Sequence, residues 1–144
     1  MSTGENSTTL TLEVSVGEAL DKLSILEIKL SKITDHRKND VQREYDALAP
    51  TLNAIIEKHQ CQSVYQRLKK VNLEIWEKQD LLRNLDTDEE TKIKFYMGIE
   101  EVNDCRFRVK SEINCLANSK LVEQKSYACF TEGVGRSPTV AKQR

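Results

Sequence analysis

The sequence predicts an all-α protein, a mostly antiparallel bundle of about four helices with flexible ends. Its apolar residues recur at spacings of three and four in successive stretches, which is the pattern of helices with one buried face. The 144 residues include only five glycines and two prolines, which leaves little material for the many turns of a β protein. The stretches between the helical patterns are short and polar, which favours up-and-down connections.

We expect the first helix, residues 15–33, to organise the rest of the chain because its apolar residues occupy two opposite faces. Ser15 and Glu18 have the spacing of a capping box and mark its start. Ile25 and Ile28 point away from the main apolar stripe at about 100° per residue. A helix that is apolar on two sides has to be covered on two sides. The main stripe consists of Val16, Ala19, Leu20, Leu23, Leu26, Leu30 and Ile33.

The second predicted helix follows a polar turn at residues 34–38, and Asn39 or Asp40 is its expected N-cap. Pro50 lies inside its apolar stripe, where it removes one backbone hydrogen bond. Because the apolar period continues beyond Pro50, we expect a kink at this position and not the end of the helix. The stripe consists of Val41, Tyr45, Leu48, Leu52, Ile55 and Ile56.

Two further capping boxes, Ser63 with Gln66 and Thr87 with Glu90, predict the starts of the third and fourth helices. The fourth helix is the longest and extends to about Asn118. The inner stripe of the third helix consists of Val64, Leu68, Val71, Ile75 and Leu82. That of the fourth consists of Phe95, Ile99, Val102, Val109, Ile113 and Leu116.

These patterns divide the chain into one helical domain, residues 13–127, between two polar ends. Residues 1–12 are expected to be a disordered lead, since they begin with a stretch rich in Ser, Thr, Gly and Asn. Residues 128–144 are expected to be a flexible tail, since they contain Gly133, Gly135 and Pro138. Residues 119–127 either continue the fourth helix or wrap back onto the bundle, and both alternatives stay open at this stage.

Composition excludes several classes of function. The 22 basic and 23 acidic residues leave no net field that would attract nucleic acid or an anionic membrane. No apolar run approaches the roughly 20 residues of a membrane span. The four cysteines show no metal-binding or disulfide spacing, so we expect reduced thiols in a cytoplasmic protein. We therefore expect no nucleic acid, no membrane and no cofactor among the partners.

Four blocks of the sequence carry a family likeness: residues 13–30, 71–85, 102–114 and 119–127. In this order they resemble DUF6165, a family of small helical proteins of unknown function. The resemblance implies a domain with its own identity but no reaction. It also implies a set of polar positions: Asp21, Lys22, Asn72, Asp80, Arg83, Asn103, Asp104, Arg106, Lys110, Asn114, Glu123 and Lys125.

A magnesium site is the first chemical candidate. Glu74 with Glu77, and Glu101 with Asp104, have the acid spacing of all-α, MazG-like nucleotide pyrophosphohydrolases. Metal ligands have to converge, whereas Glu74 and Glu77 lie opposite the apolar stripe of the third helix and Asp104 lies opposite that of the fourth. We therefore expect solvated acids and no metal site.

An anion site between helices is the second candidate. Arg106 lies inside the apolar stripe of the fourth helix, where an unpaired guanidinium would cost several kcal/mol, so something has to neutralise it. An anionic ligand is one answer, and an ion pair with Glu27 or Asp80 is the structural alternative. The candidate ligand-binding residues are Lys22, Asn72, Asp80, Arg83, Asn103, Arg106, Lys110 and Asn114.

A docking surface for a protein partner or for self-association is the third candidate, because amphipathic helices around a two-faced one can leave apolar area uncovered. Since the chain carries no catalytic motif, we interpret it first as a helical binding or assembly module. The alternative is a small all-α enzyme or ligand-binding domain for an anionic metabolite, a phosphate or a carboxylate. Whether the protein is an enzyme stays open.

Overall fold

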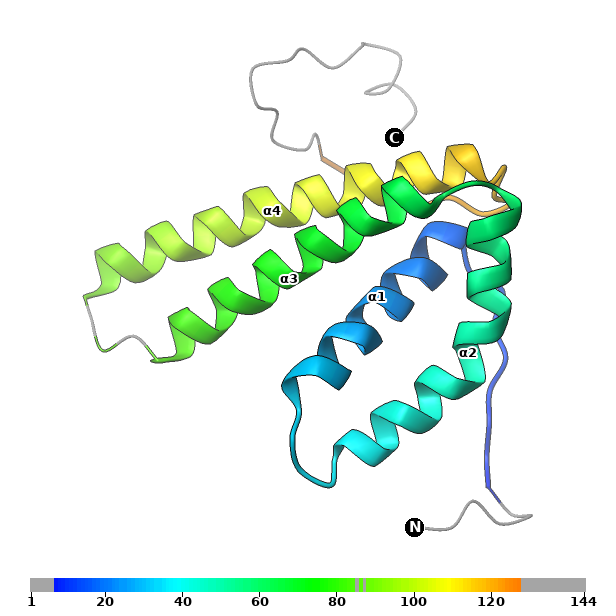
Figure 1. Ribbon diagram of the computed structural model, residues 1–144. Helices are drawn as coiled ribbons and strands as arrows, with labels where there is room; N and C mark the ends of the chain where they lie inside the picture. Colours follow the sequence, from blue (N-terminus) through cyan, green and yellow to red (C-terminus); the bar gives the residue numbers. More distant parts are fainter. Residues whose placement is uncertain (1–6, 85, 87, 128–144) are drawn as a thin grey trace.

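The computed structural model describes residues 7–84, 86 and 88–127, and within them it contains four α-helices and no strand. Figure 1 shows two antiparallel helical hairpins in succession. The first hairpin consists of α1 (Val16–Lys32) and α2 (Lys38–Lys58), and the second of α3 (Gln62–Asn84) and α4 (Glu89–Leu116). The predicted fold class, an all-α helical bundle, is therefore confirmed.

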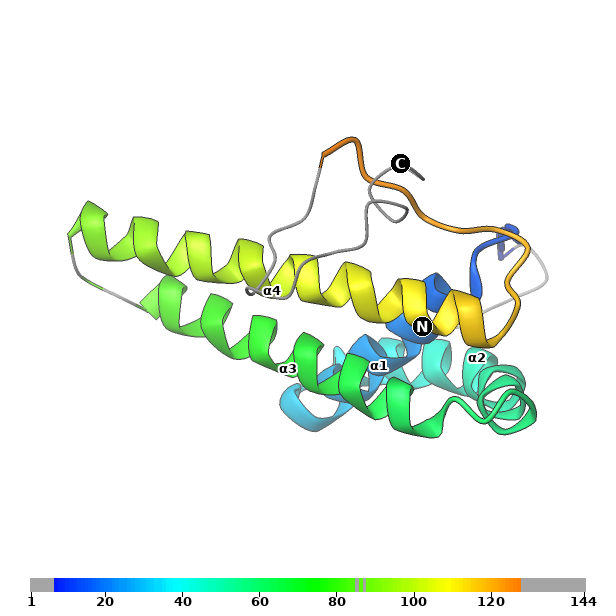
Figure 2. The ribbon, with the colours of Figure 1, turned by 90° about the horizontal axis from the view of Figure 1, so that it is seen from above.

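Helix α1 lies between the other elements and packs against α2, α3 and α4, whereas α2 and α4 do not contact each other within the described residues. Both views show that the α3–α4 hairpin extends well beyond α1 and α2 (Figures 1 and 2). We call this extension, residues 76–84 of α3 and 89–100 of α4, the outer hairpin. In the views it is a two-helix layer without a third helix on it.

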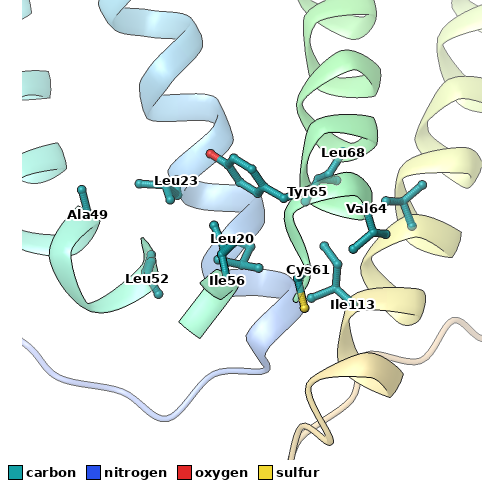
Figure 3. Close-up of a cluster of buried hydrophobic side chains, with 11 residues drawn as sticks. Leu20, Leu23, Ala49, Leu52, Ile56, Cys61, Val64, Tyr65, Leu68 and Ile113 are labelled. Atoms are coloured by element: carbon teal, nitrogen blue, oxygen red, sulfur yellow. The ribbon is translucent and has the colours of Figure 1, made fainter. Parts of the chain in front are cut away.

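The hydrophobic core lies where α1 packs against the other three helices, at the inner end of the α3–α4 hairpin (Figure 3). Leu20 and Leu23 of α1 are fully buried at its centre, between α2 on one side and α3 with α4 on the other. The second face of α1 is covered at Ile28, which is 3% exposed, and only partly at Ile25. The remaining core residues are Ala49, Leu52, Ile56, Cys61, Val64, Tyr65, Leu68, Val109 and Ile113.

The start of α1 is confirmed and that of α2 is not. The Ser15 hydroxyl accepts a hydrogen bond from the Glu18 backbone N–H and caps α1, as its capping-box spacing predicts. Helix α2 begins after Arg37, which makes no side-chain cap, so the predicted caps Asn39 and Asp40 are wrong. Both lie inside the first turn because a backbone-bonded turn already leads into the helix.

The predicted caps of α3 and α4 are each displaced by one or two residues. Helix α3 begins at Gln62, so Ser63 lies inside the helix and cannot cap it. In α4, the Asp88 carboxylate accepts a hydrogen bond from the Thr91 backbone N–H and is the N-cap. Thr87, the predicted cap, lies outside the described residues. Aspartate caps as well as threonine does and adds a favourable charge at the helix start, which explains why it takes the position.

Helix α2 continues through Pro50 and changes direction along its length, so the predicted kink without a stop is confirmed (Figure 1). Helix α4 ends at Leu116, slightly before the predicted end, and Asn118 follows with a left-handed φ of 51°. Residues 119–127 then turn back along α4, as Figure 2 shows, which decides between the two alternatives for this stretch.

Most of the two chain ends lies outside the residues that the structure describes. The expected flexible tail, residues 128–144, and residues 1–6 of the expected disordered lead lie outside the described residues. Residues 7–14 have no regular structure and are exposed. None of the helices in the described residues is long and apolar enough to cross a membrane.

Candidate functional site

Polar side chains are buried where α1 crosses the α3–α4 hairpin. This polar layer consists of Asp21, Ser24, Asn72, Arg106, Lys110 and Asn114. Each is held on the inner side of its helix, beside the apolar core, by the same helical periodicity that buries the core. All but Arg106 are at most 6% exposed. Buried polar groups have to be hydrogen-bonded, so their partners decide what the layer can do.

Asp21 and Arg106 form the centre of the polar layer. Arg106 Nε donates to Asp21 Oδ1 at 2.9 Å, and Nη2 donates to Oδ2 at 2.5 Å. The Asn72 amide donates to Asp21 Oδ1 and to the Ser24 hydroxyl, each at 2.8 Å. Arg106, which the sequence predicts to need a neutralising group, is therefore held by a two-point ion pair, the strongest arrangement for a carboxylate and a guanidinium.

The ionisation of this pair follows from its surroundings. Burial alone raises the pKa of Asp21, but the hydrogen bonds from Arg106 and Asn72 and the arginine charge outweigh it and lower the pKa below its ordinary value. The hydrogen bond to Asp21 likewise raises the pKa of Arg106. Both groups are therefore charged at neutral pH.

Lys110 is the second cation of the polar layer and is only 5% exposed. Its Nζ lies 2.7 Å from Glu18 Oε2 on α1 and 3.0 Å from Glu123 Oε1 on the returning segment. Burial lowers the pKa of Lys110, but the bonds to both carboxylates raise it above its ordinary value. Lys110 thus ties α4 to α1 and to residues 119–127.

Asn114 accepts a hydrogen bond from a free backbone N–H group at the start of α1. Its Oδ1 accepts a hydrogen bond of 2.6 Å from the Gly17 backbone N–H, and the Ser119 hydroxyl accepts one of 3.0 Å from that of Val16. The first turn of a helix has free N–H groups, which these oxygens cap. A Cβ on Gly17 would come within 2.6 Å of the Lys110 carbonyl oxygen, so only glycine allows this close approach.

A hollow of about 230 Å³ opens beside the polar layer, between α4 and residues 123–127. Asn103 lines it together with Arg106 and Lys110. Two acids, Glu100 and Glu123, line it as well. Arg106 and Lys110 already pair with carboxylates of the same chain. Lys125, the third cation that lines the hollow, lies over the rings of Phe107 and Tyr127.

The predicted ligand-binding residues fall into two groups. Asn72, Arg106, Lys110 and Asn114 meet in the polar layer, and Asn103 lies at its edge in the hollow. The other three are exposed elsewhere: Lys22 pairs with Glu44 of α2 at 2.7 Å, and Asp80 and Arg83 lie on the outer hairpin.

The predicted ion pair of Arg106 exists, but the predicted acids are wrong. The partner of Arg106 is Asp21, not Glu27 or Asp80. Glu27 instead accepts a hydrogen bond of 2.6 Å from the Tyr65 hydroxyl. One sequence signal could have identified Asp21, since it lies on the same side of α1 as Ile25 and Ile28, four and seven residues later.

The acid pairs that suggested a magnesium site do not meet. Glu74, Glu77 and Glu101 are exposed, as expected. Asp104 is only 4% exposed, so the expectation that it is solvated is wrong. Among the described residues, no group of three or more histidines, cysteines or acids lies close enough together to hold a metal ion.

The outer hairpin exposes large apolar side chains. Ile93, Tyr96 and Met97 of α4 are 57%, 59% and 59% exposed, and they share one side of the helix because they are three and four residues apart. This side faces away from α3, toward which Phe95 and Ile99 point by the same periodicity. We call these three side chains the apolar face of α4.

Comparison with known proteins identifies one family. The family described as "Family of unknown function (DUF6165)" matches residues 10–140. The chain matches none of the curated proteins and none of the solved structures with which it was compared.

Proposed function

We propose that the chain, which belongs to the DUF6165 family, is a helical protein-binding module that acts without catalysis and docks a partner protein on its outer hairpin. The apolar face of α4 carries this proposal. Burying one large apolar side chain is worth about 1.5–3 kcal/mol, so three of them side by side are a substantial source of binding free energy. Such clusters on a protein surface typically mark interaction sites.

The polar layer supports the same choice by its composition. A ligand site for a phosphate or carboxylate needs cations whose charge is not already neutralised. Arg106 is bound by Asp21, and Lys110 by Glu18 and Glu123. An anionic metabolite would have to displace these carboxylates, and leaving the buried Asp21 carboxylate without its charged partner costs about 3–5 kcal/mol. The layer is better explained as the structural joint between α1 and the long hairpin.

The charge of the outer hairpin indicates the chemistry of the partner. Residues 76–100 contain seven acidic and four basic residues. Acids flank the apolar face along the same side of α4, Glu89 before it and Glu100 after it. A partner segment with an apolar stripe and basic flanks complements this surface. We therefore infer an amphipathic, basic segment of another protein as the occupant.

Free thiols support a cytoplasmic setting for this module. Cys61, Cys105 and Cys115 are unpaired by disulfides in the described residues, and exposed thiols persist in reducing compartments.

A designed peptide tests the proposal without knowledge of the natural partner. The probe has leucines at positions i, i+3, i+4 and i+7 and lysines elsewhere; the controls replace every lysine by glutamate or every leucine by serine. Amide chemical shifts of the ¹⁵N-labelled full chain are followed during titration. We expect the first probe alone to shift the signals of residues 89–100. Shifts confined to the hollow beside Lys110, or equal binding of all three peptides, would contradict the proposal.

A further inference from the structure

The returning segment ends at a place that points to a second role for the apolar face. Residues 119–127 run back along α4, from Asn114 past Phe107 to Glu100: Ser119 bonds to the start of α1 beside Asn114, and Tyr127 lines the same hollow as Glu100. In Figure 2 this segment is the orange stretch above α4. The next element along this path is the apolar face of α4.

We propose that the C-terminal tail, residues 128–144, docks on the apolar face of α4 in the free protein. The inference rests on the docking surface of the proposed function and adds its regulation: a partner has to displace the chain's own tail.

The length of the tail fits this path. Glu100 and Ile93 are seven residues apart on α4, which is about 10 Å at the helical rise of about 1.5 Å per residue. An extended chain spans about 3.3 Å per residue, so three residues beyond Tyr127 cover that distance. The third of them is Phe130, the only aromatic residue of the tail. It can therefore reach Tyr96 and Met97 as an apolar anchor.

The charge of the tail complements the surface that it would cross. Residues 128–144 contain three basic residues and one acidic residue, whereas residues 76–100 contain seven acidic and four basic residues. Basic charge is also a feature that we infer for the partner segment. The family match also extends through Val140, so most of the tail belongs to the matched region.

A spin label on the tail tests this docking in the full chain. Ser137 is changed to Cys and labelled, and Cys105, Cys115 and Cys129 are changed to Ser; Cys61 stays because it is fully buried. We expect the label to halve the amide signals of residues 89–97 while those of α2 keep their intensity. Phe130→Asp should abolish the loss. Thr131→Asp, which adds the same charge beside the anchor, should keep most of it.

Three results would overturn the inference: no excess signal loss on residues 89–97, a loss that Phe130→Asp does not change, or an equal loss in a mixture of spin-labelled chain without ¹⁵N and ¹⁵N-labelled chain without the spin label. The last result would place the tail on a second copy. The spin-label experiment and the peptide titration can give different outcomes. Peptide binding without signal loss refutes only the tail docking. Signal loss in the wild type, together with no peptide binding by the wild type or by Phe130→Asp, refutes only the partner site.

Discussion

Asp21 and Arg106 are 85 residues apart in the chain and meet through two parallel hydrogen bonds across the joint between α1 and α4. The carboxylate is 2% exposed, and the arginine side chain is 30% exposed. This pair therefore fixes how the first hairpin sits on the second, and it occupies the guanidinium that the sequence offers as an anion-binding group.

Removing the arginine should weaken the fold. Arg106→Ala leaves the buried Asp21 carboxylate without its charged partner, which should lower the free energy of unfolding by about 3 kcal/mol. Arg67→Ala is the matched control, since the Arg67–Glu112 pair also joins two helices but is about half exposed. We expect it to cost less than about 1 kcal/mol. Urea denaturation of the three proteins measures both values. An unchanged or raised midpoint for Arg106→Ala would favour a ligand role.

The low pKa of Asp21 predicts a specific acid sensitivity. A carboxyl whose pKa is lowered in the folded state stabilises the fold above its unfolded pKa of about 3.9, and this contribution is lost as pH falls through the folded value. Asp21→Asn should therefore be less stable than the wild type at pH 7 and lose less stability below about pH 4. Glu57→Gln, at an exposed site on α2, is the control. Denaturation midpoints between pH 7 and pH 2 that fall in parallel for Asp21→Asn and the wild type would refute this.

Two glycines in helices should respond to alanine with opposite signs. Alanine favours a helix over glycine by about 1 kcal/mol, which is the gain expected for Gly98→Ala because nothing lies within 4 Å of the new Cβ. At Gly17 the Cβ would lie 2.6 Å from the Lys110 carbonyl oxygen. Gly17→Ala should therefore destabilise by about 1–3 kcal/mol, the scale of overpacking. Thermal unfolding of both variants checks the pair, and stabilisation by Gly17→Ala would show that α1 does not approach α4 this closely.

The helices themselves could be predicted from local patterns. Their apolar period fixes the buried side of each, and Ser15 marks the start of α1 because its hydroxyl bonds within the same turn. The start of α2 could not be predicted in this way, because backbone hydrogen bonds around Arg37 form the turn there and no side chain caps the helix. Asp88 and Thr87 are adjacent, and both residue types cap helices well. Sequence patterns locate the start of a helix only to within one or two residues, so they do not distinguish the two.

The polar layer could be predicted only in part. An arginine in an apolar stripe requires an anionic partner, either an acid of the chain or a ligand, and that requirement follows from the sequence alone. The position of Asp21 on the same side of α1 as Ile25 and Ile28 makes it a candidate partner of Arg106. The choice among candidate acids depends on the register of α1 against α4, which the local pattern does not contain. The ion pair of Lys110 with Glu123 could not be predicted either, because Glu123 lies in a non-helical segment that returns along α4.

The most direct test of the docking surface compares two substitutions on α4. Met97→Glu places a charge within the apolar face, and Leu116→Glu places the same charge at an exposed leucine near the other end of the helix. Affinity for the leucine–lysine peptide is measured by fluorescence anisotropy for the wild type and both full-length variants. We expect Met97→Glu to weaken binding at least about tenfold, the equivalent of about 1.4 kcal/mol, and Leu116→Glu to leave it unchanged. Equal affinity of Met97→Glu and the wild type, or equal weakening by both substitutions, would contradict docking on the apolar face of α4.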